Sequence, residues 1–223
     1  MAAFRRLVFI SVLAGLAAGL AISAIQAAKL WPLIAAAEVL EAAAPADHTH
    51  DHGWEPEGLV RQALTVLFNI AAGIGFALLL NALARLRSLS TGRPLTGQEG
   101  LLWGLAGFAA FALAPALGLP PELPGMASGD LLARQLWWVA TAVCTGGALA
   151  LGVFRGGSWI AVAVLLAILP HLSGVPAGED HGPVPGELAA AFVAASLIAS
   201  AVFWAVLGVV SGWINQRWGE SAT

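Results

Sequence analysis

Six long apolar runs constrain this chain more than any other feature of its sequence. A helix that crosses the hydrocarbon core of a bilayer needs about 20 predominantly apolar residues. The runs near that length are Leu7–Ala28, Leu59–Ala84, Gly100–Gly118, Gln135–Phe154, Ser158–Leu172 and Leu188–Trp213. The fifth holds only 15 residues and ends in Pro170 and His171, so a short or broken span is the alternative there. We therefore predict an all-α, polytopic membrane helix bundle of about six spans, with five as the alternative count, forming a single membrane domain over residues 1–223.

The composition supports a membrane protein rather than a soluble one. The chain is 59% hydrophobic and only 10% charged, whereas soluble domains carry about 25% charged residues. No apolar run alternates with a period of two residues, which argues against a transmembrane β-barrel. Cys144 is the only cysteine, so an intrachain disulfide framework and a CxxC metal or redox pair are excluded.

The charges separate when the runs are threaded through a bilayer. Six spans place the N-terminus, the Arg85–Gly97 segment, the Arg155–Gly157 turn and the C-terminus on one side, with seven basic residues and two acids, a net charge of +5. The other side holds three basic residues, eleven acids and all five histidines, a net charge of −8. Because arginine and lysine favour the cytoplasmic side, we predict that both termini are cytoplasmic in a bacterial inner membrane. A count of five spans would place one arginine cluster on the wrong side.

The first run has two further features. It begins after Arg5 and Arg6 and ends in small residues, so a cleaved signal peptide is an alternative to a retained span, although 22 residues exceed a usual signal core. Gly15 and Gly19 also have the small-xxx-small spacing that allows two helices to approach closely, as do Gly208 and Gly212 in the last run. We interpret both glycine pairs as packing positions.

The first outer segment, residues 29–58, is rich in histidine and acid. Its first half predicts a short amphipathic helix at the membrane interface, and its second half contains Asp47, His48, His50, Asp51 and His52. Imidazole and carboxylate ligands suit Co²⁺, Ni²⁺, Zn²⁺ and Cu²⁺, and histidines at alternate positions can converge on one ion in an extended loop. We predict a metal-capture site here; a solvated polar loop without such a role is the alternative.

Two other histidines are candidates. His171 follows Pro170 at the outer end of the fifth run, and an ionisable side chain at membrane depth is a functional candidate because its burial is costly. An interfacial histidine that reaches water is the alternative. His181 belongs to a smaller acidic cluster with Glu179 and Asp180, for which a solvated turn is the simpler interpretation.

A polar segment, Leu119–Trp138, interrupts the apolar runs in the second half of the chain. Three prolines and two glycines stop a helix there, and the candidate residues of an outer mouth are Glu122, Asp130, Arg134, His181 and Glu187. Structural roles compete with this interpretation, since Asp130 can cap a helix that begins near Leu131 and can pair with Arg134 four residues later. Glu187 can likewise occupy the first turn of the last helix, where the helix dipole favours an acid.

Two polar residues lie near or within the apolar runs. Asn69 and Gln26 are predicted to form interhelical hydrogen bonds. The sequence contains no GxxxxGK[ST], HExxH or GxSxG motif, so we do not predict an enzyme. It presents no basic and aromatic surface typical of nucleic-acid binding.

Several segments together resemble a known family. They are FRRL at 4–7, AAGIGFALL at 71–79, GLLWGLAGF at 100–108, LAPALGLPPELPG at 113–125, ARQLWW at 133–138, LPHL at 169–172 and FWAVLG at 203–208. With the histidine-bearing first loop, these resemble the CbtA-type family, described as predicted cobalt transporter subunits. The resemblance implies cobalt uptake linked to cobalamin supply and a small single-span partner subunit that bears its own histidine motif. The family is usually described with five spans.

These observations lead to one main expectation and one rival. The expectation is an inner-membrane permease subunit that takes up a divalent transition metal, with Co²⁺ first and Ni²⁺ or another such ion as alternatives. The first loop would capture the ion and pass it to the mouth near His171. The rival is a structural or assembly subunit of a larger membrane complex, which transports nothing.

Overall fold

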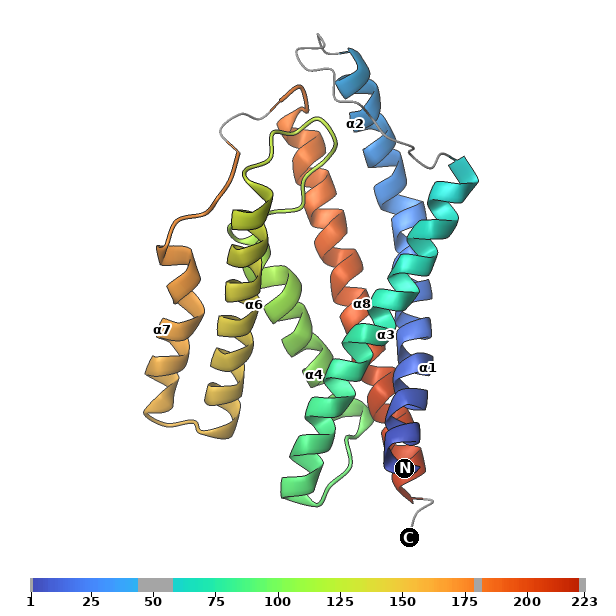
Figure 1. Ribbon diagram of the computed structural model, residues 1–223, viewed down its shortest axis with the longest axis vertical. Helices are drawn as coiled ribbons and strands as arrows, with labels where there is room; N and C mark the ends of the chain where they lie inside the picture. Colours follow the sequence, from blue (N-terminus) through green and yellow to red (C-terminus); the bar gives the residue numbers. More distant parts are fainter. Residues whose placement is uncertain (1, 44–57, 179–181, 221–223) are drawn as a thin grey trace. The chain divides into compact units, whose positions relative to one another are not determined.

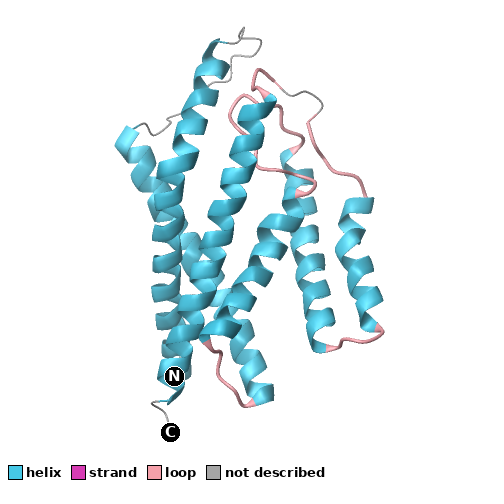
Figure 2. Ribbon diagram, turned by 180° about the vertical axis from the view of Figure 1, so that it is seen from behind, coloured by secondary structure: helices cyan, strands magenta, loops and turns pink. Residues whose placement is uncertain are grey.

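The computed structural model describes residues 2–43, 58–178 and 182–220, and in these ranges all regular secondary structure is helical (Figures 1 and 2). The elements are α1 (Ala2–Ile25), the π-helical η1 (Gln26–Leu30), α2 (Trp31–Ala43), α3 (Gly58–Thr91), α4 (Gly97–Phe108), the π-helical η2 (Ala109–Leu113), α5 (Ala114–Ala116), α6 (Leu131–Phe154), α7 (Trp159–Leu172) and α8 (Gly186–Glu220). The prediction of an all-α membrane protein is confirmed.

Five helical stretches are long and apolar enough to cross a membrane. They are Ala3–Ala43, Gly58–Thr91, Gly97–Ala116, Leu131–Phe154 and Gly186–Trp218. The remaining predicted run forms α7, which has 14 residues and is therefore about 21 Å long, against about 30 Å for the hydrocarbon core. The fifth run is thus a short helix, as its length in the sequence indicates.

The end of the first span differs from the expected boundary. The sequence predicts a break near Lys29 and a separate short helix, whereas α1, η1 and α2 follow one another as a continuous helix to Ala43. The π-helical turn comes just before Pro32, which lacks an N–H and whose ring would clash with the carbonyl group of Ala28 in a regular α-helix. The wider turn accommodates this proline without ending the helix. A helix over 31–43 is therefore present, and its position at the interface stays a prediction.

The described residues form two compact units. Unit 1 contains residues 1–28, 45–105 and 199–223, and unit 2 contains residues 29–44 and 106–198. Helices α4 and α8 contribute one part to each unit.

In unit 1, glycines bring helix backbones into close contact. Gly15 and Gly19 of α1 lie against the backbone of α3 around Gly73 and Ile70, and Gly208 of α8 lies against Gly100 and Gly104 of α4. A Cβ atom at any of these glycines would collide with a neighbouring backbone. The predicted packing role of both small-xxx-small pairs is confirmed.

Polar side chains inside the helices of unit 1 are paired across them. Asn69 donates hydrogen bonds to Ser23 Oγ (2.9 Å) and Gln26 Oε1 (2.6 Å), as predicted for Asn69 and Gln26. A second network joins three helices, because Asn81 of α3 donates to Ser11 Oγ of α1 (3.3 Å) and to Ser211 Oγ of α8 (3.1 Å). Such bonds satisfy amides that lipid could not satisfy.

In unit 2, α6 and α7 form an antiparallel hairpin, joined by the turn at Arg155–Gly157, which lies where the sequence predicts it. Gly156 and Gly157 adopt φ angles of +58° and +53°, which glycine adopts at little cost. Near the other end of the hairpin, Trp137 Nε1 donates to the carbonyl oxygen of Pro170 (3.0 Å). The two long connections beyond the hairpin therefore emerge at the same end of unit 2.

The packing of the helix ends bears on the predicted number of crossings. In unit 1 the start of α1 meets the end of α8, where an Arg6 guanidinium nitrogen donates to the carbonyl oxygen of Asn215 (3.0 Å). Two chain ends on the same side of a bilayer require an even number of crossings. With α7 as a short crossing, six spans would place both termini on one side, and this count stays a prediction.

Candidate functional site

Two connections of unit 2, residues 117–130 and 173–185, pack tightly against each other. Gly129 lies against the carbonyl group of Pro176, and Gly178 against that of Ala127, with no room for a Cβ atom at either glycine. Gly125, at φ +79°, makes the turn that lets this segment double back. An added Cβ at Gly125 would also lie 3.2 Å from Cβ of Glu41, so the end of α2 borders the same surface.

This surface, which we call the outer cluster, contains an ion pair. A guanidinium nitrogen of Arg134 on α6 lies 2.5 Å from Glu122 Oε2, and the two side chains are 23% and 19% exposed. Ser128 Oγ donates to the same Glu122 oxygen at 2.8 Å. Glu122 is therefore held in place by α6 and by its own loop, and its charge is balanced.

Asp130 has a structural role that differs in part from the prediction. Its Oδ1 accepts a hydrogen bond from the N–H of Ala133 (2.8 Å), so Asp130 is the N-cap of α6, as expected. The predicted helical pair between Asp130 and Arg134 is wrong, because Arg134 reaches back to Glu122 instead. Glu187 lies in the first turn of α8, which is the predicted placement.

His171 lies in the last turn of α7 and is held by two neighbours. Its Nε2 is 3.2 Å from the carbonyl oxygen of Ala114, and its ring meets the indole of Trp137 edge-on, with the ring centres 5.3 Å apart. A carbonyl oxygen only accepts, so Nε2 is the donor in this hydrogen bond and Nδ1 is the ring nitrogen left for another partner. This is the arrangement usual for metal-binding histidines, whose second ring nitrogen donates to a carbonyl group or carboxylate.

The remaining predicted ligands fall outside the described residues. These are Asp47, His48, His50, Asp51 and His52 of the first outer segment, and His181 of the last. Among the residues that the structure does describe, no three His, Cys, Asp or Glu side chains come together as a metal-ligand set. The predicted metal-capture site stays a prediction.

Several residues that organise the two units were not predicted from the sequence. Trp137 is only 7% exposed and contacts both Pro170 and His171. In unit 1, Asn81 and Asn215 are linked by a hydrogen bond of 2.8 Å. An amide side chain within an apolar run was the available signal for Asn81, as it was for Asn69.

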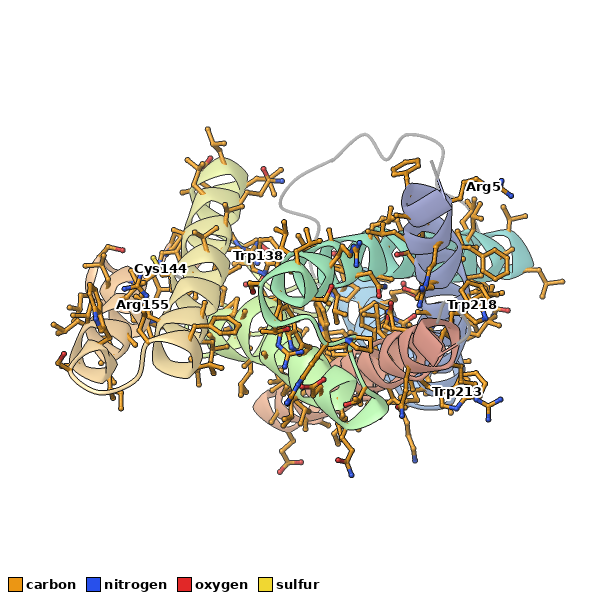
Figure 3. All side chains as sticks on the ribbon, turned by 90° about the horizontal axis from the view of Figure 1, so that it is seen from below. Arg5, Trp138, Cys144, Arg155, Trp213 and Trp218 are labelled. Carbon is orange, nitrogen blue, oxygen red and sulfur yellow. The ribbon has the colours of Figure 1, made fainter. Side chains whose placement is uncertain are left out.

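The aromatic residues at the arginine-rich end of unit 1 form a second group. Trp218 of α8 stacks on Phe9 of α1, with ring centres 5.1 Å apart, and the Arg217 guanidinium lies over the Trp213 ring at 4.4 Å. Figure 3 labels both tryptophans and the exposed Arg5 at the start of α1. Tryptophan and arginine together are typical of a membrane–water interface.

The helices and their paired polar residues define a multi-pass membrane protein. The chain belongs to the CbtA family, described as probable cobalt transporter subunits, whose model matches residues 4–216. Comparisons with curated proteins and with solved structures gave no match.

Proposed function

We propose that this chain is a permease subunit for the uptake of a divalent transition metal, with Co²⁺ as the transported substrate. The observation that carries the proposal is the family match, which covers nearly the whole chain. Ni²⁺ or another divalent transition metal would suit the same ligand types, because imidazole and carboxylate do not by themselves separate these ions. The proposed site of action is the inner membrane of a bacterium, where uptake would serve cobalamin supply.

The proposed route begins at the first outer segment. Asp47, His48, His50, Asp51 and His52 would capture the ion, with the surplus of acids on the proposed outer side raising the local cation concentration. His171 would receive the ion through Nδ1, since Nε2 is engaged with Ala114. Glu122, Asp130 and Arg134 would then shape the mouth rather than bind the metal, because each already has a partner.

Uptake of radiolabelled cobalt by cells tests the capture segment. Replacing His48, His50 and His52 together with alanine should reduce uptake at limiting cobalt and leave it nearly unchanged at saturating cobalt, because a capture site raises affinity. Replacing Gln98, an exposed residue on the arginine-rich side, with alanine is the control. Unchanged uptake by the triple variant at limiting cobalt would remove this segment from the mechanism.

Reconstitution separates transport from assembly. The purified chain is placed in vesicles alone and together with a small single-span, histidine-bearing subunit, and cobalt flux is measured with a fluorescent indicator inside the vesicles. Flux that depends on this chain and falls with His171→Ala supports the permease. Flux from the partner alone, unchanged when this chain is added, would favour the rival role as an assembly subunit.

A further inference from the structure

A cavity lined by arginines lies at one end of unit 1. It has a volume of about 550 Å³ and is formed by the start of α1, the end of α3, the α3–α4 connection and Asn215 of α8. Its polar lining consists of Arg6, Ser88, Arg85, Arg93, Asn81 and Asn215. Among the described residues that line it there is no aspartate or glutamate, so the cavity is strongly positive.

The three arginines keep donor groups for a ligand. Arg6 is half-buried and donates to a backbone carbonyl group, and Arg85 is exposed and has only a long contact of 3.5 Å with Ser88 Oγ. Within the described part of the chain, none of Arg6, Arg85 and Arg93 forms an ion pair. The neighbouring Arg87 differs, because Glu99 binds it at 2.6 Å. Glu99 thus neutralises Arg87 next to the cavity, whereas no acid lies among the described residues that line it.

Two asparagines in the cavity wall are hydrogen-bonded to their neighbours. Asn215 donates to Asn81 Oδ1 and to the carbonyl oxygen of Ser211, both at 2.8 Å, and Asn81 is 4% exposed. The side-chain amide hydrogens of both asparagines already have acceptors within the protein. The arginine guanidinium groups are therefore the donors that remain for a ligand. Ile10 and Leu95, which are 1% and 3% exposed, add an apolar wall.

The geometry points to a binding site for a phosphate ester at this cavity. Guanidinium groups match phosphate oxygens with paired N–H donors, and several around one anion favour a phosphate group. The volume lies in the range of small-molecule sites, about 300–1,000 Å³, and leaves room for an organic group beside the phosphate. The headgroup of an anionic phospholipid and a soluble phosphate ester share this chemistry. A cationic substrate would be repelled, so the site is separate from the proposed metal route.

A charge-matched pair of double variants tests the site. Arg85→Gln with Arg93→Gln removes two lining guanidinium groups that make little contact with the fold. Arg5→Gln with Arg155→Gln removes the same charge at exposed positions that do not line the cavity. Each full-length protein is purified in neutral detergent and titrated with phosphatidylglycerol, glycerol 3-phosphate and phosphatidylcholine. Bound ligand is measured by native mass spectrometry, and the melting temperature is followed in parallel.

The wild-type chain should bind phosphatidylglycerol or glycerol 3-phosphate in preference to phosphatidylcholine. The lining variant should bind about 30-fold more weakly, from about a fivefold to sixfold loss for each arginine, whereas the control variant should change less than about threefold. Competition by glycerol 3-phosphate supports a soluble ligand, and binding of phosphatidylglycerol alone supports a lipid headgroup. Equal losses in the two variants, or no preference for either phosphate ligand in the wild type, would overturn the proposal.

Discussion

Single glycines decide how closely the helices of unit 1 can approach. Gly73→Ala should destabilise the protein, because the new methyl group would lie 2.5 Å from the carbonyl oxygen of Gly15 on α1. Overpacking of this kind costs about 1–3 kcal/mol. Gly75→Ala, two residues along the same helix, meets nothing within 4 Å and should stabilise the helix by up to about 1 kcal/mol. Melting temperatures in detergent measure both changes, and equal shifts would contradict this packing.

The ion pair of the outer cluster gives a second test with single residues. Arg134→Gln leaves Glu122 half-buried with an unbalanced charge, so we expect a loss of about 1–2 kcal/mol, less than for a fully buried pair. Glu122→Gln in the same chain should recover part of that loss, because no charge then remains unpaired. A double-mutant cycle on the free energy of unfolding measures the coupling. Additive losses would show that the two side chains do not interact.

The residue-level predictions succeeded where the cause is local. The cap at Asp130 was predictable because Asp130 and Ala133 are three residues apart, and the same holds for Glu187 in the first turn of α8. The partner of Arg134 was not, because Glu122 is twelve residues away and reaches it only through the turn at Gly125. The histidines at 48, 50 and 52 lie outside the described residues, so their site stays a prediction.

Both π-helical turns lie in the same place relative to a proline. η1 ends at Leu30, two residues before Pro32, and η2 ends at Leu113, two residues before Pro115. Each proline would clash with the carbonyl group four residues earlier in a regular helix, and the wider turn relieves the clash. The predicted run Gly100–Gly118 already included Pro115, but hydropathy did not show that the first helix continues through Pro32, because prolines in most sequences mark helix ends.

Pro115→Ala tests whether the packing of unit 2 needs the π-helical turn. Alanine is the better helix former by about 3 kcal/mol, so helix propensity alone predicts a more stable protein. We expect a less stable one, because closing the turn would rotate Phe111 away from Trp138 and move the Ala114 carbonyl oxygen away from His171. The change in melting temperature shows whether Pro115→Ala stabilises or destabilises the protein. Leu117→Ala, at an exposed neighbouring position, is the control, and a rise for Pro115→Ala would show that the turn is incidental.

Across the whole molecule, charge separation predicts six crossings with both termini on one side. The arginines predict which ends face the cytoplasm, and the contact between Arg6 and Asn215 brings the start of α1 to the end of α8, as two termini on one side require. Hydropathy alone does not decide between five and six spans, because α7 is short. A helix of about 21 Å can cross if the bilayer thins locally, at a modest cost per ångström of mismatch.

Cysteine labelling in intact cells tests this topology directly. Cys144→Ser removes the one native thiol, and single cysteines then replace Ser90, Ala127, Ser158 or His48. Ser90, in the last turn of α3, and Ala127 and Ser158, in connections, are exposed, so an impermeant maleimide reaches them from whichever side they face. We expect labelling at positions 127 and 48 from outside, and at positions 90 and 158 only after the cells are opened. Labelling of position 158 from outside would mean that α6 does not cross the membrane. Protection of position 48 in intact cells would place the histidines in the cytosol, where they could not capture metal from outside.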